Sequence, residues 1–196
     1  METIVEAAKK GIAADVVRKA AELEEVPAGI LVRGLAEGTL IIPSNRTREL
    51  RRPIAIGEGV SVKINANIGS SEDLESSEGE LEKLKVAVSH GAHTVMDLST
   101  GPEWKSILGR ILERSPVPVG TVPLYQVFGQ AMRQGRDAGD VTGEEIFEAV
   151  EDHCRMGVDY LTLHCGVTQR AVQLLKEQGR KLGIVSRGGS LMAEWM

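Results

Sequence analysis

The segment best suited to hold an anion is the run Ser186-Arg187-Gly188-Gly189-Ser190, which follows a short apolar stretch and precedes a helical pattern. Two glycines leave the backbone N–H groups unhindered, two hydroxyls and a guanidinium supply further donors, and the start of a helix favours negative charge. This combination indicates a phosphate site. The same five residues would also make an ordinary turn with Arg187 in solvent, so both interpretations stay open at this point.

Two asparagines, Asn65 and Asn67, lie two positions apart at the end of an apolar run. Alternate residues of a strand face the same side of a sheet, so both carboxamides can offer donors and acceptors to a heterocycle or an oxyanion. The alternative is that the pair satisfies backbone groups at the strand end.

Three further side chains stand where apolar runs end. Asp97 is a candidate general base or hydrogen-bond anchor, and capping of the following helix is an equally physical role. His164 is either a hydrogen-bonded core residue or a functional group, and its position at a strand end favours the second. Tyr125 either reaches into the site with its hydroxyl or packs against the next helix. Ligands of parallel α/β proteins bind at the carboxyl ends of strands, which makes all three candidates for one site.

The sequence offers little for a metal. Its two cysteines, Cys154 and Cys165, cannot form a disulfide framework, and no CxxC occurs, so the chain's own thiols cannot build an iron–sulfur cluster or a structural zinc site. The pairs formed by these cysteines with His153 and His164 match no zinc spacing. We therefore expect no metal site in this chain.

The elements that must position these residues alternate along the chain. Runs rich in β-branched residues predict strands at 62–68, 93–98, 117–124, 158–164 and 183–186. Apolar residues at helical spacing predict covering helices at 80–89, 104–114 and 167–178, whereas 130–140 is polar and is predicted as a loop. Thr142 and Glu145 have the spacing of a capping box, and Gly157 should end the helix that they start. The alternation predicts a parallel sheet covered by helices, either doubly wound or a (β/α) barrel.

The first 53 residues differ in pattern from the rest. Residues 1–38 predict two or three short helices, 40–42 form a short apolar run stopped by Pro43, and 45–53 is a loop with four arginines, interpreted as a solvated linker. We expect residues 1–53 to form an N-terminal helical segment with a basic loop, and residues 54–196 to form the α/β domain.

Composition excludes several classes of protein. The chain has 196 residues, a formal charge of −5 and a pI near 5.5, which argues against a nucleic-acid partner. No signal-peptide core and no stretch of about 18 apolar residues occurs, so neither export nor a membrane partner is expected. The small number of cysteines agrees with a cytoplasmic protein.

Five motifs together resemble one enzyme family. They are KINANIG at 63–69, VMDLSTG at 95–101, SPVPVGTVPLYQ at 115–126, GVDY at 157–160 with His164, and GIVSRGGS at 183–190. In this order and spacing they closely resemble the phosphomethylpyrimidine synthase family, which makes the pyrimidine of thiamine. The compact N-terminal part is similar to the short archaeal and anaerobic-bacterial branch.

The resemblance implies a (β/α)8 TIM-type barrel, of which this chain would carry about five strands. It also implies a carbon–carbon lyase that uses S-adenosylmethionine, a 4Fe-4S cluster and a divalent metal such as zinc. The implied substrate is 5-aminoimidazole ribotide, rearranged to 4-amino-5-hydroxymethyl-2-methylpyrimidine phosphate, and the implied assembly is a homodimer.

Matched by motif, the residues implied to contact the substrate are Asn67, Met96, Tyr125, His164, Ser186, Arg187 and Gly188, with His164 and Asp97 as the catalytic candidates. The family's CxxCxxxxC and its two metal-binding histidines are not found in these 196 residues. We therefore expect the chain to be the N-terminal half of a longer enzyme, with the metal and cluster ligands in the other half.

Three alternatives stay open. A sister enzyme of the same family, 5-hydroxybenzimidazole synthase of anaerobic cobalamin synthesis, is implied to share the substrate, the cofactor and these motifs. A non-catalytic module that binds a phosphate ligand is the alternative of another class, and a generic lyase-type barrel is a weaker third choice. A downstream CxxCxxxxC would favour the radical enzyme over the binding module.

Overall fold

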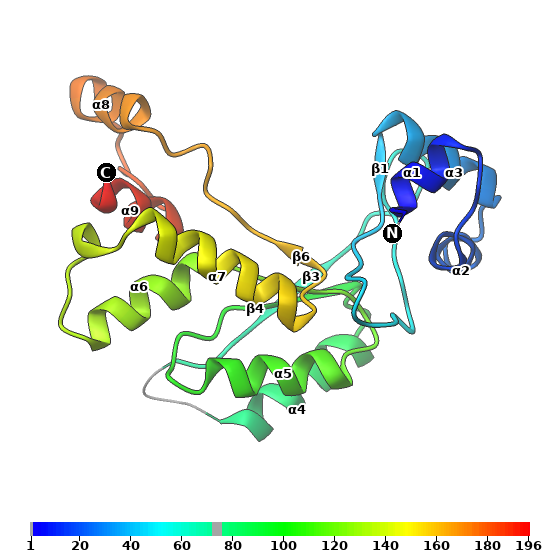
Figure 1. The fold of residues 1–196 in the computed structure, drawn as a ribbon, viewed down its shortest axis with the longest axis horizontal. Helices are drawn as coiled ribbons and strands as arrows, with labels where there is room; N and C mark the ends of the chain where they lie inside the picture. The colour runs from blue at the N-terminus through cyan, green and yellow to red at the C-terminus, as the bar shows by residue number, and fades with distance from the viewer. Residues whose placement is uncertain (1, 72–75) are drawn as a thin grey trace.

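The computed structural model describes residues 2–71 and 76–196, which form an α/β fold (Figure 1). Its helices are α1 (Ile4–Lys9), α2 (Asp15–Leu23), α3 (Ala28–Glu37), α4 (Ser77–Ser89), α5 (Trp104–Arg114), α6 (Pro123–Arg133), the 3-10 helix η1 (Ala138–Asp140), α7 (Gly143–Met156), α8 (Gln169–Gln178) and α9 (Arg187–Trp195). Its strands are β1 (Leu40–Ile41), β2 (Ile56–Gly57), β3 (Asn65–Ile68), β4 (Thr94–Asp97), β5 (Val119–Thr121) and β6 (Tyr160–Leu161).

The main sheet follows the order of the chain. Within the described residues it has four parallel strands in the order β3-β4-β5-β6. Val95 and Val119 are fully buried against α4 and α5, which lie next to each other along the sheet (Figure 1). Thr121, two residues after Val119, bonds to His153 of α7 over 2.7 Å, so α7 covers the same face. The residues next to these along each strand therefore point to the opposite face of the sheet.

The predicted parallel α/β arrangement is confirmed, but one predicted strand is wrong. Residues 183–186 form no strand, and they lead into α9. Gly183 has a φ of +58°, which interrupts extended backbone, and β6, the preceding strand, is only two residues long. The described residues form an open sheet and no closed barrel.

The structure also corrects two predictions around residue 123. The strand expected at 117–124 ends at Thr121, and Tyr125 lies in α6 instead of at a strand end. Pro123 starts this helix because its fixed φ suits the first helical turn and its missing N–H costs no hydrogen bond there. α6 runs to Arg133, so the loop predicted at 130–140 begins late and also contains η1.

The local stop and start signals of α7 are confirmed. Thr142 and Glu145 form both bonds of a capping box, with the Thr142 hydroxyl accepting from the Glu145 N–H over 3.2 Å. Gly157 ends the helix in the left-handed conformation with a φ of 102°, which favours glycine.

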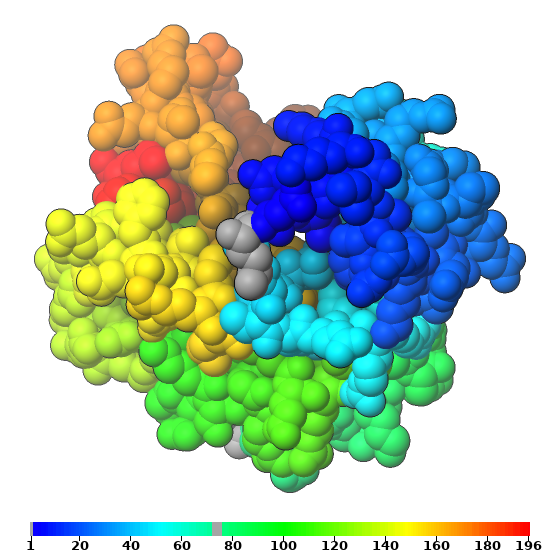
Figure 2. All heavy atoms as spheres, turned by 45° about the vertical axis from the view of Figure 1, so that its right-hand side comes forward, coloured from blue at the N-terminus to red at the C-terminus, as the bar shows by residue number. Residues whose placement is uncertain are grey.

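The N-terminal residues pack around a core of their own. Val17, Leu31 and Leu40 are buried there, and β1 pairs with β2 across the expected boundary at residue 53. Figures 1 and 2 show α1–α3 on one side of the molecule and α8 projecting from the other. No helix in the described part of the chain is long and apolar enough to cross a membrane.

The arginine-containing loop is not a solvated linker, contrary to the expectation. The Arg48 guanidinium forms an ion pair of 2.6 Å with Asp159, a carboxylate whose side chain is fully buried. The backbone N–H groups of Asn45 and Val119 donate to the same carboxylate over 2.9 and 2.8 Å. The loop therefore attaches the N-terminal helices to the start of β6.

Candidate functional site

One row of residues crosses the uncovered face of the sheet. The strand register aligns Asn67 of β3, Met96 of β4, Gly120 of β5 and Tyr160 of β6. Their neighbours along the strands, such as Val95 and Val119, point into the helix layer, so this row points the other way. Two residues of the expected substrate site, Asn67 and Met96, therefore share one surface.

A cavity of about 520 Å³ lies at the amino end of this face, beside the β1–β2 hairpin. Its walls are mostly apolar, with polar groups from the sheet; they include Ile41, Ile56, Val60, Asn65, Met96 and Tyr160. The cavity opens the face to a ligand that presents both apolar and hydrogen-bonding groups.

A second group of predicted residues gathers at the start of α9. The Ser186 hydroxyl accepts from the Gly189 N–H over 3.2 Å and caps the helix. The N–H groups of Arg187 and Gly188, at the first two helical positions, have no acceptor among the described residues. Two donors at the positive end of the helix dipole are thus unpaired, which is the arrangement that favours an anion.

The His164 side chain packs directly on this helix start. A methyl group at Gly188 would overlap with the imidazole, so the glycine is what lets the ring approach the backbone. Nδ1 of His164 is buried and has no hydrogen-bond partner among the described residues. A buried ring nitrogen without a partner is uncommon in folded proteins, which makes His164 a candidate functional residue.

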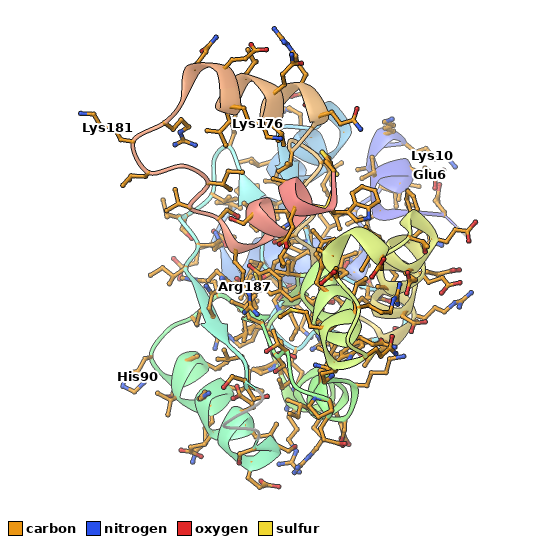
Figure 3. All side chains as sticks on the ribbon, turned by 90° about the vertical axis from the view of Figure 1, so that its left-hand side faces the viewer. Glu6, Lys10, His90, Lys176, Lys181 and Arg187 are labelled. Carbon is orange, nitrogen blue, oxygen red and sulfur yellow. The ribbon has the colours of Figure 1, made fainter. Side chains whose placement is uncertain are left out.

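Arg187 and Tyr125 also lie against each other. The guanidinium carbon is 4.9 Å from the centre of the Tyr125 ring, a cation–π contact that joins α9 to α6. Arg187 is exposed, and Figure 3 shows it near the centre of the view, with Lys181 at the outer edge beyond α8. Tyr125, His164, Ser186, Arg187 and Gly188 are thus brought together.

Asp97 lies away from both groups. It is buried on the helix-facing side of β4, where its Oδ1 accepts from the Ser99 N–H over 3.0 Å and from the Ser99 hydroxyl over 2.6 Å. Burial raises the pKa of Asp97 to about 6, and the nearby carboxylate of Glu80 adds to the rise while Lys83 opposes it. The geometry makes Asp97 the anchor of the turn after β4.

The raised pKa predicts a pH-dependent stability. A carboxyl whose pKa is about 6 when folded and 3.8 in its unperturbed form carries no penalty below pH 4, and the penalty grows as pH rises through 6. The difference in unfolding free energy between wild type and Asp97→Asn should therefore rise by about 3 kcal/mol as pH falls from 7 to 4. Burial lowers the pKa of His153 to about 4, an opposite trend that cancels in this difference. Urea unfolding of both proteins at several pH values measures it, and a pH-independent difference would refute the assignment.

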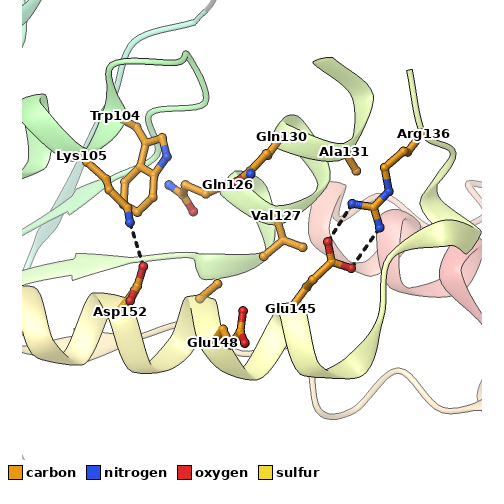
Figure 4. A pocket seen from close by; sticks show the side chains of 11 residues that line it. Trp104, Lys105, Gln126, Val127, Gln130, Ala131, Arg136, Glu145, Glu148 and Asp152 are labelled. Carbon is orange, nitrogen blue, oxygen red and sulfur yellow. Dashed lines mark hydrogen bonds and ion pairs between the residues drawn. The ribbon is translucent and has the colours of Figure 1, made fainter. Parts of the chain in front are cut away.

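A smaller cavity, of about 220 Å³, lies between α5, α6 and α7 (Figure 4). Two ion pairs line it, Lys105 with Asp152 over 2.8 Å and Arg136 with Glu145 over 2.7 Å. None of the residues predicted to act on a ligand is in its walls, so it is not a candidate site.

The described residues offer no metal centre. No group of three or more His, Cys, Asp or Glu side chains among them could hold a metal ion, and both cysteines are exposed free thiols. An iron–sulfur cluster, which needs several thiolates together, does not fit this part of the chain.

Sequence reasoning missed three members of the sheet face, Tyr160, Thr94 and Gly120. Tyr160 and Thr94 both donate a hydrogen bond to the Asn65 carboxamide, each over 2.9 Å. Gly120, inside the strand predicted at 117–124, was the signal that could have revealed this contact. A glycine inside a strand indicates that another group approaches the backbone closely.

Comparison with known proteins gives a consistent result. The model of a family described as the radical SAM ThiC family matches residues 3–196. The chain is 46% identical over 194 residues to phosphomethylpyrimidine synthase of Desulfitobacterium hafniense, covering 99% of this chain and 45% of the relative. It is 46% identical over 183 residues to the enzyme of that name from Methanopyrus kandleri, covering 93% of this chain and 43% of the relative. The chain thus spans less than half the length of these curated relatives.

Proposed function

This chain belongs to the radical SAM ThiC family, and we propose that it forms the ribotide-binding part of a phosphomethylpyrimidine synthase. The reaction converts 5-aminoimidazole ribotide to 4-amino-5-hydroxymethyl-2-methylpyrimidine phosphate. The observation that carries the proposal is the start of α9, where two N–H groups have no acceptor among the described residues, His164 packs on Gly188 and Arg187 lies over the Tyr125 ring. A carbon–carbon lyase assignment and a homodimer are parts of the same proposal.

The phosphate of the ribotide binds at the start of α9. The N–H groups of Arg187 and Gly188 point out of the helix, and the Arg187 guanidinium adds a permanent positive charge. Stacking on Tyr125 restricts the arginine side chain, which lowers the entropy lost when it binds the phosphate.

The imidazole and ribose of the ligand lie toward the sheet face. There Asn67 supplies hydrogen bonds and Met96 supplies a polarisable apolar surface for a flat ring. His164, which packs on the start of α9, is the residue proposed to hold or move a proton at Nδ1. Asp97 anchors the turn after β4 and does not touch the ligand.

The family implies an iron–sulfur cluster and S-adenosylmethionine, and a divalent metal was expected with them. No described side chains form a site for the cluster or the metal, so no reaction step is assigned to these groups here. We propose that their ligands belong to the part of the enzyme that corresponds to the rest of the relatives' length.

The sheet is proposed to be part of the wall of a (β/α)8 barrel. Two features support this: the four strands follow the chain order, and the helices that contact them lie on one face. In a doubly wound sheet, helices cover both faces. The row from Asn67 to Tyr160 would then point into the barrel interior.

The proposed phosphate site predicts a defined loss of affinity. Arg187→Ala should raise the Kd of the full-length protein for 5-aminoimidazole ribotide by about 10- to 100-fold, because a charge-assisted hydrogen bond is lost. The Kd for the dephosphorylated riboside should change less than twofold. Isothermal titration with both ligands measures this, and Lys181→Ala, at the outer edge of the molecule, serves as the matched control (Figure 3). An unchanged Kd for the ribotide in Arg187→Ala would show that the phosphate does not bind at this site.

A further inference from the structure

Tyr160 reaches across the sheet to a strand far from its own. It stands on β6, at one end of the strand order, yet its phenolic oxygen lies 2.9 Å from Asn65 Oδ1 on β3 and 3.2 Å from the Val95 carbonyl on β4. The glycine at position 120 makes this possible, because a side chain there would overlap with the Tyr160 ring. The ring therefore lies flat over β5.

Two hydroxyl groups fix the orientation of the Asn65 carboxamide. Tyr160 and Thr94 both point their protons at its oxygen, and Thr94 is buried. If the carboxamide turned round, its N–H₂ group would face the two hydroxyls and both hydrogen bonds to the Asn65 oxygen would be lost. Losing two hydrogen bonds is costly, so the oxygen of Asn65 stays toward the hydroxyls.

The fixed orientation of the Asn65 carboxamide also fixes the orientation of the Asn67 carboxamide. The Asn65 amide nitrogen donates to Asn67 Oδ1 over 2.8 Å, so the oxygen of Asn67 faces Asn65. The Asn67 amide nitrogen has no acceptor among the described residues. Asn67 therefore presents an N–H₂ donor to the space over the sheet, and it suits a ligand atom that accepts a hydrogen bond, such as a ring nitrogen or a sugar oxygen.

We propose that Tyr160 is a positioning residue that acts through Asn65 to hold Asn67 as a hydrogen-bond donor to the ligand. The inference rests on the proposed function, which gives Asn67 its ligand. The Tyr160 hydroxyl itself bonds to Asn65 and to the Val95 carbonyl, so it acts on the ligand through Asn65. Its effect on binding must then depend on the presence of the Asn67 carboxamide.

A double-mutant cycle on the full-length protein tests this dependence. Tyr160→Phe should raise the Kd for 5-aminoimidazole ribotide about five- to tenfold, the effect of one hydrogen bond. In an Asn67→Ala background the same change should alter Kd less than twofold. A merely structural role would weaken binding equally in both backgrounds, and that result would overturn the proposal.

Two further variants keep the test decisive. Thr121→Val removes a buried hydroxyl from the opposite face of the same sheet and should leave Kd unchanged in both backgrounds. Asn65→Asp places a carboxylate where Asn67 needs a donor. It should raise Kd as Tyr160→Phe does, and only when Asn67 is present. This variant tests the proposal if Tyr160→Phe does not fold. If Asn67→Ala weakens binding and neither Tyr160→Phe nor Asn65→Asp does, the positioning role alone is wrong. If the wild type does not bind the ribotide, the proposed function is wrong and the positioning role with it.

Discussion

Arg48→Ala should lower the free energy of unfolding by about 3–5 kcal/mol, because it leaves a buried carboxylate without its charged partner. Asp159 is fully buried at its side chain and Arg48 is 12% exposed, so water cannot replace the lost guanidinium. Arg48 also donates to the Ser115 carbonyl over 2.8 Å, and that acceptor would lose its partner as well. Urea unfolding followed by circular dichroism measures the change.

The control for this prediction is in the same loop. Arg46 is exposed and makes no ion pair among the described residues, so Arg46→Ala should change the unfolding free energy by no more than about 0.5 kcal/mol. Asp159→Ala should lower the unfolding free energy as much as Arg48→Ala does, because it leaves the Arg48 guanidinium without its partner. If the two arginine variants were equally stable, the loop would be the solvated linker that its composition predicts.

His164→Ala should lower kcat of the full-length enzyme by about 100-fold or more while changing the ribotide Kd less than about tenfold. General acid–base groups contribute about 10²–10⁴ to a rate, whereas one neutral hydrogen bond contributes about 1 kcal/mol to binding. The buried Nδ1 without a partner and the position of the ring on the α9 start support this role. Anaerobic turnover assays and titration of the same preparations separate the two effects.

Two other variants sharpen the histidine prediction. His164→Gln keeps a hydrogen-bonding side chain but cannot exchange a proton, so it should lose turnover as His164→Ala does. Gly188→Ala would displace the imidazole from the helix start and should also reduce kcat, with the histidine still present. Full turnover in His164→Ala would show that the imidazole only packs on α9.

The sequence predicts those features of the fold that depend on neighbouring residues. Thr142 and Glu145 are three residues apart, so the capping box could be recognised and is confirmed. The strand predicted at 183–186 is wrong because a strand needs a partner, and no pattern in four consecutive residues shows whether one is present. Pro123 starts a helix where β-branched neighbours favoured a strand, since its fit to a helix start outweighed their propensity.

The candidate site shows the same limit. The run from Ser186 to Ser190 could be predicted as a helix start with free N–H groups because every group in it is local. Arg48 was misjudged because Asp159 lies 111 residues further along the chain. Tyr160 was missed because Asn65, its partner, is 95 residues away and the glycine that lets it pass is on a third strand. Contacts between distant residues depend on strand register, which cannot be predicted from the local sequence pattern.

We propose above that these residues bind 5-aminoimidazole ribotide for conversion to a pyrimidine phosphate. The most direct measurement is anaerobic incubation of the full-length protein with the ribotide, S-adenosylmethionine and a reductant, followed by mass identification of the product. We predict 4-amino-5-hydroxymethyl-2-methylpyrimidine phosphate, formed by the wild type and much reduced in Arg187→Ala. A hydroxybenzimidazole product, or no consumption of the ribotide, would contradict the claim.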